Sequence, residues 1–135
     1  MKKILTSDKI YVNESKIPNS GRGVYAKNDI KKGEIIENCP TIKVSKHDAA
    51  NLTETILVTY FFYFGKKKEQ LTVALGFGSI YNHTNKPNAK YKINPLENTI
   101  DFIALKDINE DDEITINYSP SGNSKNKNPL WFEVS

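Results

Sequence analysis

Residues 76–88 read GFGSIYNHTNKPN, a segment rich in turn residues just past the middle of the chain. Within it, Asn82 and His83 place an amide beside an imidazole. Such a pair can bind the edge of a purine or a polar amino-acid group. A structural loop is the alternative, because short polar side chains also cap their own backbone. Taken alone, the segment leaves both interpretations open.

Two further segments lie on either side of it along the chain. Residues 21–26 read GRGVYA, and their glycines allow a positive φ or the close approach of a ligand to the main chain. A hairpin turn is the alternative, and the third glycine and the helix of a dinucleotide-binding fingerprint are missing. Residues 111–118 read DDEITINY, an acidic turn followed by an alternating strand that ends in Tyr118. An edge strand with a solvent-facing tyrosine is the alternative for this segment.

The order of the three segments is more specific than any one of them. Gly-Arg-Gly-Val from Gly21, Asn-His-x-x-x-Pro-Asn from Asn82 and Glu-Ile-Thr-x-x-Tyr from Glu113 together resemble the signature of the SET domain, the main lysine methyltransferase fold. The resemblance covers about residues 9–120. It is greatest to the small stand-alone viral SET methyltransferase, which also has no flanking cysteine-zinc domains.

The resemblance implies a mostly β fold. A single SET domain of small sheets, of the β-clip type, is expected, with a C-terminal pseudoknot in which the last strand threads under a loop. The domain is expected to span residues 1–135, with a core of about 9–120 and a tail, 121–135, that folds back over the site. The composition agrees with one globular domain, since hydrophobic residues make up 38% and charged residues 26% of the chain.

Short runs of β-branched and aromatic residues separated by turn residues also predict a mostly β domain. Residues 45–54 are polar and are expected to form a loop or one helical turn, whereas the aromatic run 56–64 is expected to be a buried strand. The other expected strands are residues 10–12, 23–26, 34–37, 41–44, 71–75, 89–93, 100–105 and 113–118.

The resemblance also assigns a cofactor site for S-adenosylmethionine, with S-adenosylhomocysteine as the product. Gly21, Arg22 and Gly23 are expected to hold the methionine end of the cofactor through backbone groups. Asn82 and His83 are expected to hold its adenine and amino-acid end. The viral relative has an aromatic residue in place of the arginine, so a role for that side chain does not carry over.

Two tyrosines are expected to carry the chemistry. Tyr118 would stand at the methyl-transfer centre and contact the cofactor, and Tyr60 would be a second catalytic residue and a wall of the lysine channel. Ile116 and Trp131 are expected to be further walls, with Trp131 and Phe132 in the tail. Many relatives carry Phe or Tyr where this chain has isoleucine, and the smaller side chain favours multiple methylation.

The residue composition is compatible with this chemistry and argues against a metal enzyme, a membrane protein and a secreted protein. Methyl transfer from a sulfonium to an amine is an in-line displacement, for which no metal site is expected. The single cysteine, Cys39, and the two histidines, His47 and His83, cannot build a cysteine-rich zinc site or a histidine cage. No apolar run approaches the roughly 20 residues of a membrane span. The first residues are basic with no apolar stretch behind them, so an intracellular protein, cytoplasmic or nuclear, without a secretion signal is expected.

Three functions remain open at this point. The first is an active protein-lysine methyltransferase that acts on a histone or another DNA-packaging or basic protein. The second is a SET-like binding module without activity, against which the presence of Tyr118, Asn82 and His83 argues. The third is a small domain that binds nucleic acid in a salt-sensitive way. A net charge of +3 and a single arginine argue against this third function, so no nucleic-acid or membrane partner is expected, whereas a homodimer is compatible with the viral relative.

Overall fold

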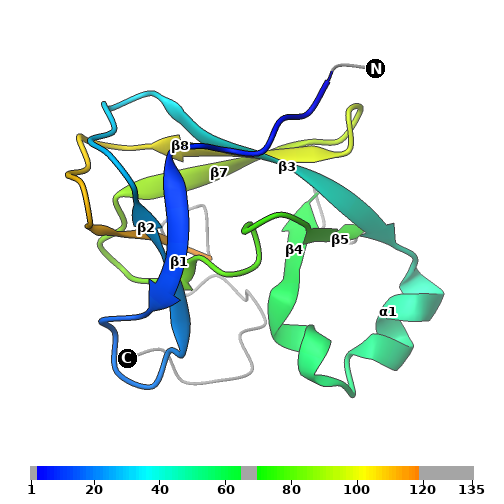
Figure 1. Cartoon of the computed structure of the whole chain (residues 1–135). Helices are drawn as coiled ribbons and strands as arrows, with labels where there is room; N and C mark the ends of the chain where they lie inside the picture. The colour runs from blue at the N-terminus through cyan, green and yellow to red at the C-terminus, as the bar shows by residue number, and fades with distance from the viewer. Residues whose placement is uncertain (1–2, 65–69, 119–135) are drawn as a thin grey trace.

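The computed structural model describes residues 3–64 and 70–118, which form two sheets (Figure 1). The first sheet has the order β1-β2-β9-β6 and the second the order β4-β5-β3-β8-β7. The expected mostly β fold is confirmed. The strands are β1 (Ile10–Glu14), β2 (Arg22–Ala26), β3 (Ile35–Val44), β4 (Phe61–Phe64), β5 (Gln70–Ala74), β6 (Asn82–His83), β7 (Ala89–Asn94), β8 (Thr99–Ala104) and β9 (Glu113–Ile116).

The first sheet brings the three sequence motifs together. Strand β9 lies between β2, with which it is antiparallel, and β6, with which it is parallel. The glycine motif therefore lies on one side of β9 and the Asn-His motif on the other. β9 comes late in the chain but lies between two earlier strands, so it pairs with residues that are distant in the sequence. The expected pseudoknot would require the same kind of long-range pairing. Residues 82–83, expected within a turn-rich segment, form a short strand.

The second sheet depends on one long strand where two short ones were expected. β3 is continuous from residue 35 to 44, so the predicted division into residues 34–37 and 41–44 is wrong. Its first half pairs with β8 and its second half with β5. Pro40 lies at this changeover, and its carbonyl accepts a hydrogen bond from the Leu75 N–H at 2.9 Å. A proline without an N–H is tolerated there because the pairing partner changes.

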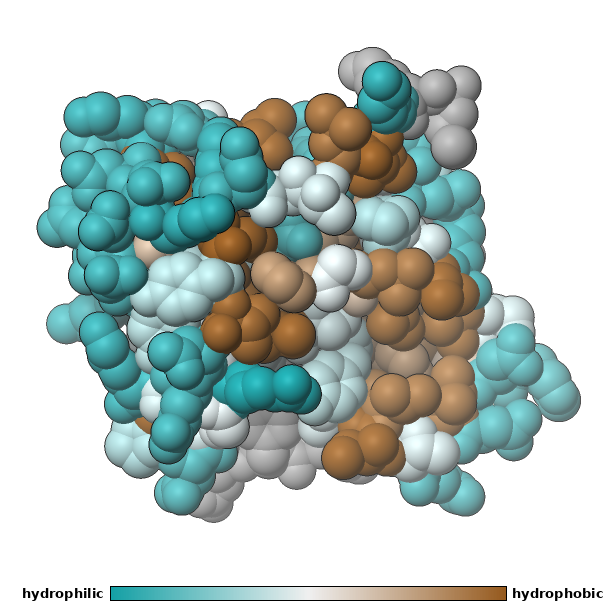
Figure 2. Space-filling model, viewed as in Figure 1, coloured by the Kyte–Doolittle hydropathy of each residue, from teal (hydrophilic) through white to brown (hydrophobic). Residues whose placement is uncertain are grey.

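The aromatic run 56–64 is only partly a strand. Residues Ile56–Tyr60 form the 3-10 helix η1, and only β4 continues the run. The Thr55 hydroxyl caps η1 by accepting a hydrogen bond from the Leu57 N–H at 3.2 Å. Ile56 is 78% exposed, so a buried strand over the whole run is wrong. Figure 2 shows apolar side chains gathered on the half of the surface that carries β4, β5 and α1.

The polar segment after β3 forms a helix longer than the single turn expected. Helix α1 spans Lys46–Leu52. The Ser45 side chain caps it by accepting a hydrogen bond from the Asp48 N–H at 3.1 Å, which satisfies one of the free donors of the first turn. Only Ala49 is buried in this helix, which packs beside Phe61 and Leu71.

The main core is filled by aliphatic and aromatic side chains from both sheets. Ile114 and Ile116 of β9 are fully buried, as the predicted alternation of that strand requires. Tyr81 stacks on Phe102 of β8 with ring centroids 4.3 Å apart. Burial of these side chains fixes β9 in register, since a one-residue shift would move both isoleucines to the opposite face.

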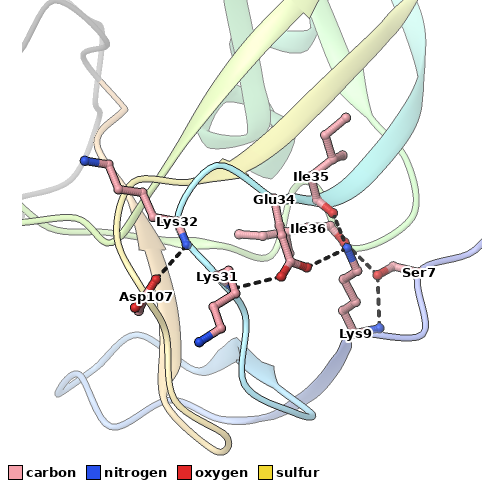
Figure 3. A network of polar contacts seen from close by, with 8 residues as sticks. All are labelled: Ser7, Lys9, Lys31, Lys32, Glu34, Ile35, Ile36 and Asp107. Atoms are coloured by element: carbon pink, nitrogen blue, oxygen red, sulfur yellow. Dashed lines mark hydrogen bonds and ion pairs between the residues drawn. The ribbon is translucent and has the colours of Figure 1, made fainter.

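A separate polar network ties the N-terminal segment to the start of β3 (Figure 3). The Glu34 carboxylate accepts hydrogen bonds from the Lys31 N–H and from Lys9 Nζ, both at 3.0 Å. The Ser7 hydroxyl donates to the Ile36 carbonyl at 2.6 Å, and the Lys32 N–H donates to Asp107 at 2.8 Å. These contacts hold the N-terminal segment and the 107 turn against the residues around the start of β3.

Candidate functional site

Asn88, the last residue of the Asn-His motif, joins that motif to β9. Its side-chain Nδ2 donates to the Glu113 carbonyl at 2.9 Å, and its Oδ1 accepts from the Thr115 N–H at 2.9 Å. The amide side chain thus pairs with β9 as a backbone peptide group would. The Asn-His motif is therefore fixed to the third motif at two places, through β6 and through Asn88.

An open pocket of about 680 Å³ lies where the three motifs meet. Its lining includes six residues that were assigned to a site from the sequence and seven that were not assigned. The six are Gly21, Arg22, Tyr60, Asn82, His83 and Tyr118. The seven are Ile17, Pro18, Asn19, Ser20, Thr59, Ser79 and Ile80.

Two other predicted site residues lie outside the pocket lining, and a third is not described. Gly23 is buried behind the lining, and Ile116 is fully buried in the core and does not line this pocket. Their contact with cofactor or substrate stays a prediction. Trp131 lies outside the described residues, as do the rest of the predicted tail and the expected turn at residues 65–69.

The unassigned lining residues of the 17–22 loop had a partial signal in the sequence. Pro18 to Gly21 are turn residues that directly precede the glycine motif. Asn19 and Gly21 both take a positive φ, 63° and 66°. These two left-handed residues bend the loop sharply around the pocket that it lines. Thr59, Ser79 and Ile80 had no signal, because their position depends on how η1 and residues 76–81 pack.

Gly23 is needed for space rather than for a special backbone conformation. A Cβ at this position would lie 2.3 Å from Glu113 Oε2 and 3.1 Å from Asn82 Nδ2. Those two atoms are themselves hydrogen-bonded at 3.0 Å, and Asn82 Nδ2 also donates to the Arg22 carbonyl at 3.0 Å. All three motifs therefore meet at the Asn82 amide.

Beneath the pocket, a buried carboxylate anchors residues 76–81. Glu37 is 7% exposed and accepts hydrogen bonds from the Phe77 N–H and the Tyr81 hydroxyl, both at 2.9 Å. Burial, followed by the charge of Glu37, raises the pKa of Tyr81. Gly76 takes a φ of +63°, and a Cβ there would lie 2.6 Å from Glu37 Oε2. No residue pattern around Glu37 predicted its contacts with residues 76–81.

His83 is held as a neutral imidazole against Tyr118. Its Nδ1 accepts a hydrogen bond from the Tyr118 N–H at 2.9 Å, and the two ring centroids are 5.0 Å apart. An Nδ1 that accepts cannot carry a proton, so the proton of the neutral ring is on Nε2. Burial lowers the pKa of His83, and a side-chain hydrogen bond with Asn85 opposes this shift.

This lowered pKa predicts a pH dependence of stability. Below its ordinary pKa of 6.5, the unfolded chain binds a proton at His83 that the folded chain resists. The free energy of unfolding should therefore be undiminished above that pH and fall as the pH drops below it. Denaturant unfolding of the wild type and of His83→Ala between about pH 7.5 and pH 5.5 tests this. The variant should lose less stability over the interval, and an equal loss in both proteins would contradict the assignment.

Tyr118 presents a protonated hydroxyl to the pocket region. The hydroxyl donates to the Tyr81 carbonyl at 2.8 Å, and the Tyr118 carbonyl accepts from the Tyr91 hydroxyl at 3.2 Å. Burial raises the pKa of Tyr118 to about 12, and the nearby Tyr60 adds to the shift. The phenol therefore keeps its proton at neutral pH, and its oxygen can still accept weak contacts.

Tyr60 lines the same pocket but comes from η1, which directly precedes β4 of the second sheet. It is the last residue of η1 and is 39% exposed. The structure thus brings together the two tyrosines that the sequence assigned to catalysis, although the segment that carries Tyr60 is a 3-10 helix and not the expected strand.

In residues 3–64 and 70–118, no group of three or more His, Cys, Asp or Glu side chains is placed to hold a metal ion. No helix in this part of the chain is long and apolar enough to cross a membrane. Cys39 is buried, and burial raises the pKa of its thiol, so it has no thiolate character at neutral pH.

Comparison with known proteins identifies the family. The SET domain family model matches residues 21–119. A histone-lysine N-methyltransferase of Schizosaccharomyces pombe, specific for H3 lysine-37, is 32% identical over 114 residues, which are 84% of this chain and 71% of that protein. The chain therefore belongs to the SET domain family, which confirms the predicted fold class. The particular likeness to the viral relative stays a prediction.

Solved structures share this fold. A candidate histone methyltransferase from Plasmodium falciparum is 34% identical, with a TM-score of 0.64, over 86% of this chain and 96% of that chain. A chain of the Chaetomium thermophilum Polycomb Repressive Complex 2, in an autoinhibited conformation bound to S-adenosylmethionine, is 21% identical, with a TM-score of 0.72. That match covers 85% of this chain and 15% of the other, and it shows the fold alone.

Proposed function

We infer that this SET domain is an S-adenosylmethionine-dependent protein-lysine N-methyltransferase, and we propose that the open pocket binds the cofactor. The observation that carries the site proposal is that one pocket receives residues from all three motifs. Arg22 comes from the glycine motif, Asn82 from the Asn-His motif, and Tyr118 from the third. No observation favours the alternative of an inactive binding module.

The pocket fits the cofactor in size and in chemistry. Its volume of about 680 Å³ lies within the roughly 300–1,000 Å³ typical of small-molecule sites. Both amide hydrogens of Asn82 donate to protein groups, to Glu113 and to Arg22. Its Oδ1, which accepts no hydrogen bond from the described residues, suits the ammonium group of S-adenosylmethionine. Residues 19–22 also line the pocket and add polar lining groups.

The bound cofactor would supply a methyl group activated by a sulfonium. The protein then has two tasks, to orient the lysine amine and to favour its neutral form, since a free lysine has a pKa near ~10.4. Tyr60 and Tyr118 would form aromatic walls around the bound lysine, and the desolvation that comes with substrate binding would favour the uncharged amine. Tyr118 keeps its own proton, so we assign it to orientation and to contact with the methyl group rather than to proton removal.

The substrate is a lysine in a protein. A histone is our proposal for that protein, because two of the similar proteins are named as histone methyltransferases. Multiple methylation, favoured by Ile116, is a further proposal. So are an intracellular location, a homodimer, and a tail of residues 121–135 that covers the channel with Trp131.

Cofactor binding can be tested with two histidine variants. Titration calorimetry with S-adenosylmethionine in the presence of a chelator should show binding by the wild type. His83→Ala should weaken that binding, because His83 lines the pocket and holds the Tyr118 backbone. His47→Ala is the matched control, since His47 is exposed in α1 and does not line the pocket.

Each variant must first be shown to be folded, because a half-buried histidine also supports structure. Absence of both heat and thermal stabilisation at millimolar cofactor would remove the proposed pocket. Equal affinities of the two variants would remove His83 from the site.

A further inference from the structure

Glu113, at the start of β9, receives hydrogen bonds from two separate segments of the chain. Its Oε1 accepts from the Ser15 hydroxyl and the Lys16 N–H, both at 3.0 Å. Its Oε2 accepts from the same hydroxyl at 2.8 Å and from Asn82 Nδ2 at 3.0 Å. Every one of these partners is a donor, so both oxygens of the side chain serve as acceptors.

The first of these segments forms the outer wall of the pocket. Ser15 begins a closed loop, because its N–H donates to the Gly21 carbonyl at 2.8 Å. The Ser15 hydroxyl also accepts from the Ile17 N–H at 3.0 Å. Residues 17–22 all line the pocket, whereas Ser15 and Glu113 do not. The carboxylate therefore holds the base of this loop from behind the lining.

The second segment carries the amide that faces the pocket. Asn82 Nδ2 is shared between Glu113 and the Arg22 carbonyl. With both amide hydrogens used, the side chain is fixed with its Oδ1 as the remaining acceptor. If the amide rotated, a donor would replace this acceptor and would repel an ammonium group. The orientation of Asn82 thus depends on the charge of Glu113.

We propose that Glu113 is a positioning residue that sets the affinity for S-adenosylmethionine by fixing the 15–22 loop and the Asn82 amide together. The proposal rests on the cofactor pocket proposed above. Glu113 begins β9, whereas Tyr118 follows the end of that strand and is held by His83 and Tyr81. Loss of the Glu113 charge should therefore change cofactor affinity and leave the methyl-transfer step largely intact.

The test variant is Glu113→Gln, which keeps the size of the side chain and turns one acceptor into a donor. Whichever way the new amide points, its NH₂ group opposes either the Lys16 N–H or Asn82 Nδ2. We expect the dissociation constant and the KM for S-adenosylmethionine to rise about 10-fold or more, the scale of one charged hydrogen bond. The kcat at saturating cofactor should stay within about 3-fold of the wild type.

Glu34→Gln is the matched control. Glu34 also accepts from one backbone N–H and one side chain and holds a loop, but neither it nor its partners line the pocket (Figure 3). This variant should change thermal stability slightly and leave cofactor affinity unchanged. A loss of affinity equal to that of Glu113→Gln would reduce Glu113 to a general structural role and overturn the proposal.

A double-mutant cycle with Asn82→Ala separates positioning from global destabilisation. If Glu113 acts through Asn82 as well as through the loop, adding Glu113→Gln to Asn82→Ala should weaken affinity further only by the share of the loop contacts, about 2- to 5-fold. Full multiplication of the two single effects, or a fall in kcat at unchanged KM, would overturn the proposal. If Glu113→Gln does not fold, Ser15→Ala replaces it, with an expected loss of about 2- to 5-fold. An unchanged affinity in that variant would also count against the proposal.

The same titrations distinguish the two levels of the interpretation. A wild-type protein that binds no S-adenosylmethionine would remove the cofactor pocket and this proposal with it. A wild type that binds the cofactor, together with a folded Glu113→Gln variant of equal affinity, would overturn only the role of Glu113.

Discussion

Replacing Tyr118 with phenylalanine is expected to lower methyl transfer by about 10²–10³-fold, the scale of one lost transition-state donor or acceptor. The ring would still pack beside His83 and the main core, so fold and cofactor affinity should persist. The hydroxyl that donates to the Tyr81 carbonyl would be lost, at a cost of about 1 kcal/mol in the free energy of unfolding. Without it, the amine and the methyl group lose the oxygen that we propose aligns them.

Turnover of a good substrate at saturating S-adenosylmethionine measures this effect, with calorimetry for cofactor affinity. Tyr11→Phe is a suitable control. It also removes a hydroxyl that donates a hydrogen bond, in this case to Asp111, and Tyr11 does not line the pocket. It should keep its rate within about 3-fold. If Tyr118→Phe also kept most of its rate, Tyr118 would be a packing residue. Loss of rate and cofactor affinity together would make its role one of cofactor binding.

A single methyl group at residue 23 should disrupt the site almost as strongly. In Gly23→Ala the new Cβ would lie 2.3 Å from Glu113 Oε2 and 2.9 Å from Glu113 Cδ. The carboxylate must then leave the donors of Ser15, Lys16 and Asn82. We expect the free energy of unfolding to fall by about 1–3 kcal/mol and cofactor affinity to fall about 10- to 100-fold.

Gly33→Ala separates this effect from the general cost of removing a glycine. Gly33 has a φ of +88° and nothing within 4 Å of an added Cβ, so alanine there meets backbone strain alone. It should destabilise the fold by about 1–2 kcal/mol and leave affinity for S-adenosylmethionine unchanged. Thermal unfolding and calorimetry of both variants decide the matter. If Gly23→Ala bound the cofactor as well as Gly33→Ala does, the close packing against Glu113 would have no functional consequence.

Much of the site could be predicted because its residues lie in short ordered motifs. Gly21, Asn82 and Tyr118 are far apart in the sequence, yet all three line one pocket. The alternation of β9 could also be predicted. Successive strand side chains point to opposite faces, so the two apolar residues Ile114 and Ile116 share the face that is buried. The strand alternation follows from a local residue pattern, whereas the grouping of the three motifs at one site followed from the resemblance of their order to the SET domain signature.

The features that were missed depend on tertiary context. The run 56–64 has strong β propensity, but propensity cannot say that Ile56 would meet solvent and that the Thr55 hydroxyl would cap a 3-10 turn. The continuity of β3 through Pro40 required knowledge that its partner changes there. Glu113 was recognised as part of a motif, but its contacts with Ser15 span 98 positions and leave no local trace.

The most direct test is a screen of lysine-containing peptides with labelled S-adenosylmethionine, in which the wild type and Tyr118→Phe are measured side by side. We predict that the wild type labels a subset of the peptides, that hydrolysis releases the label as methylated lysine, and that the variant leaves the same peptides almost unlabelled. Label on residues other than lysine, equal labelling by both proteins, or no labelling of any peptide or basic protein by a wild type that binds the cofactor would contradict the proposed function.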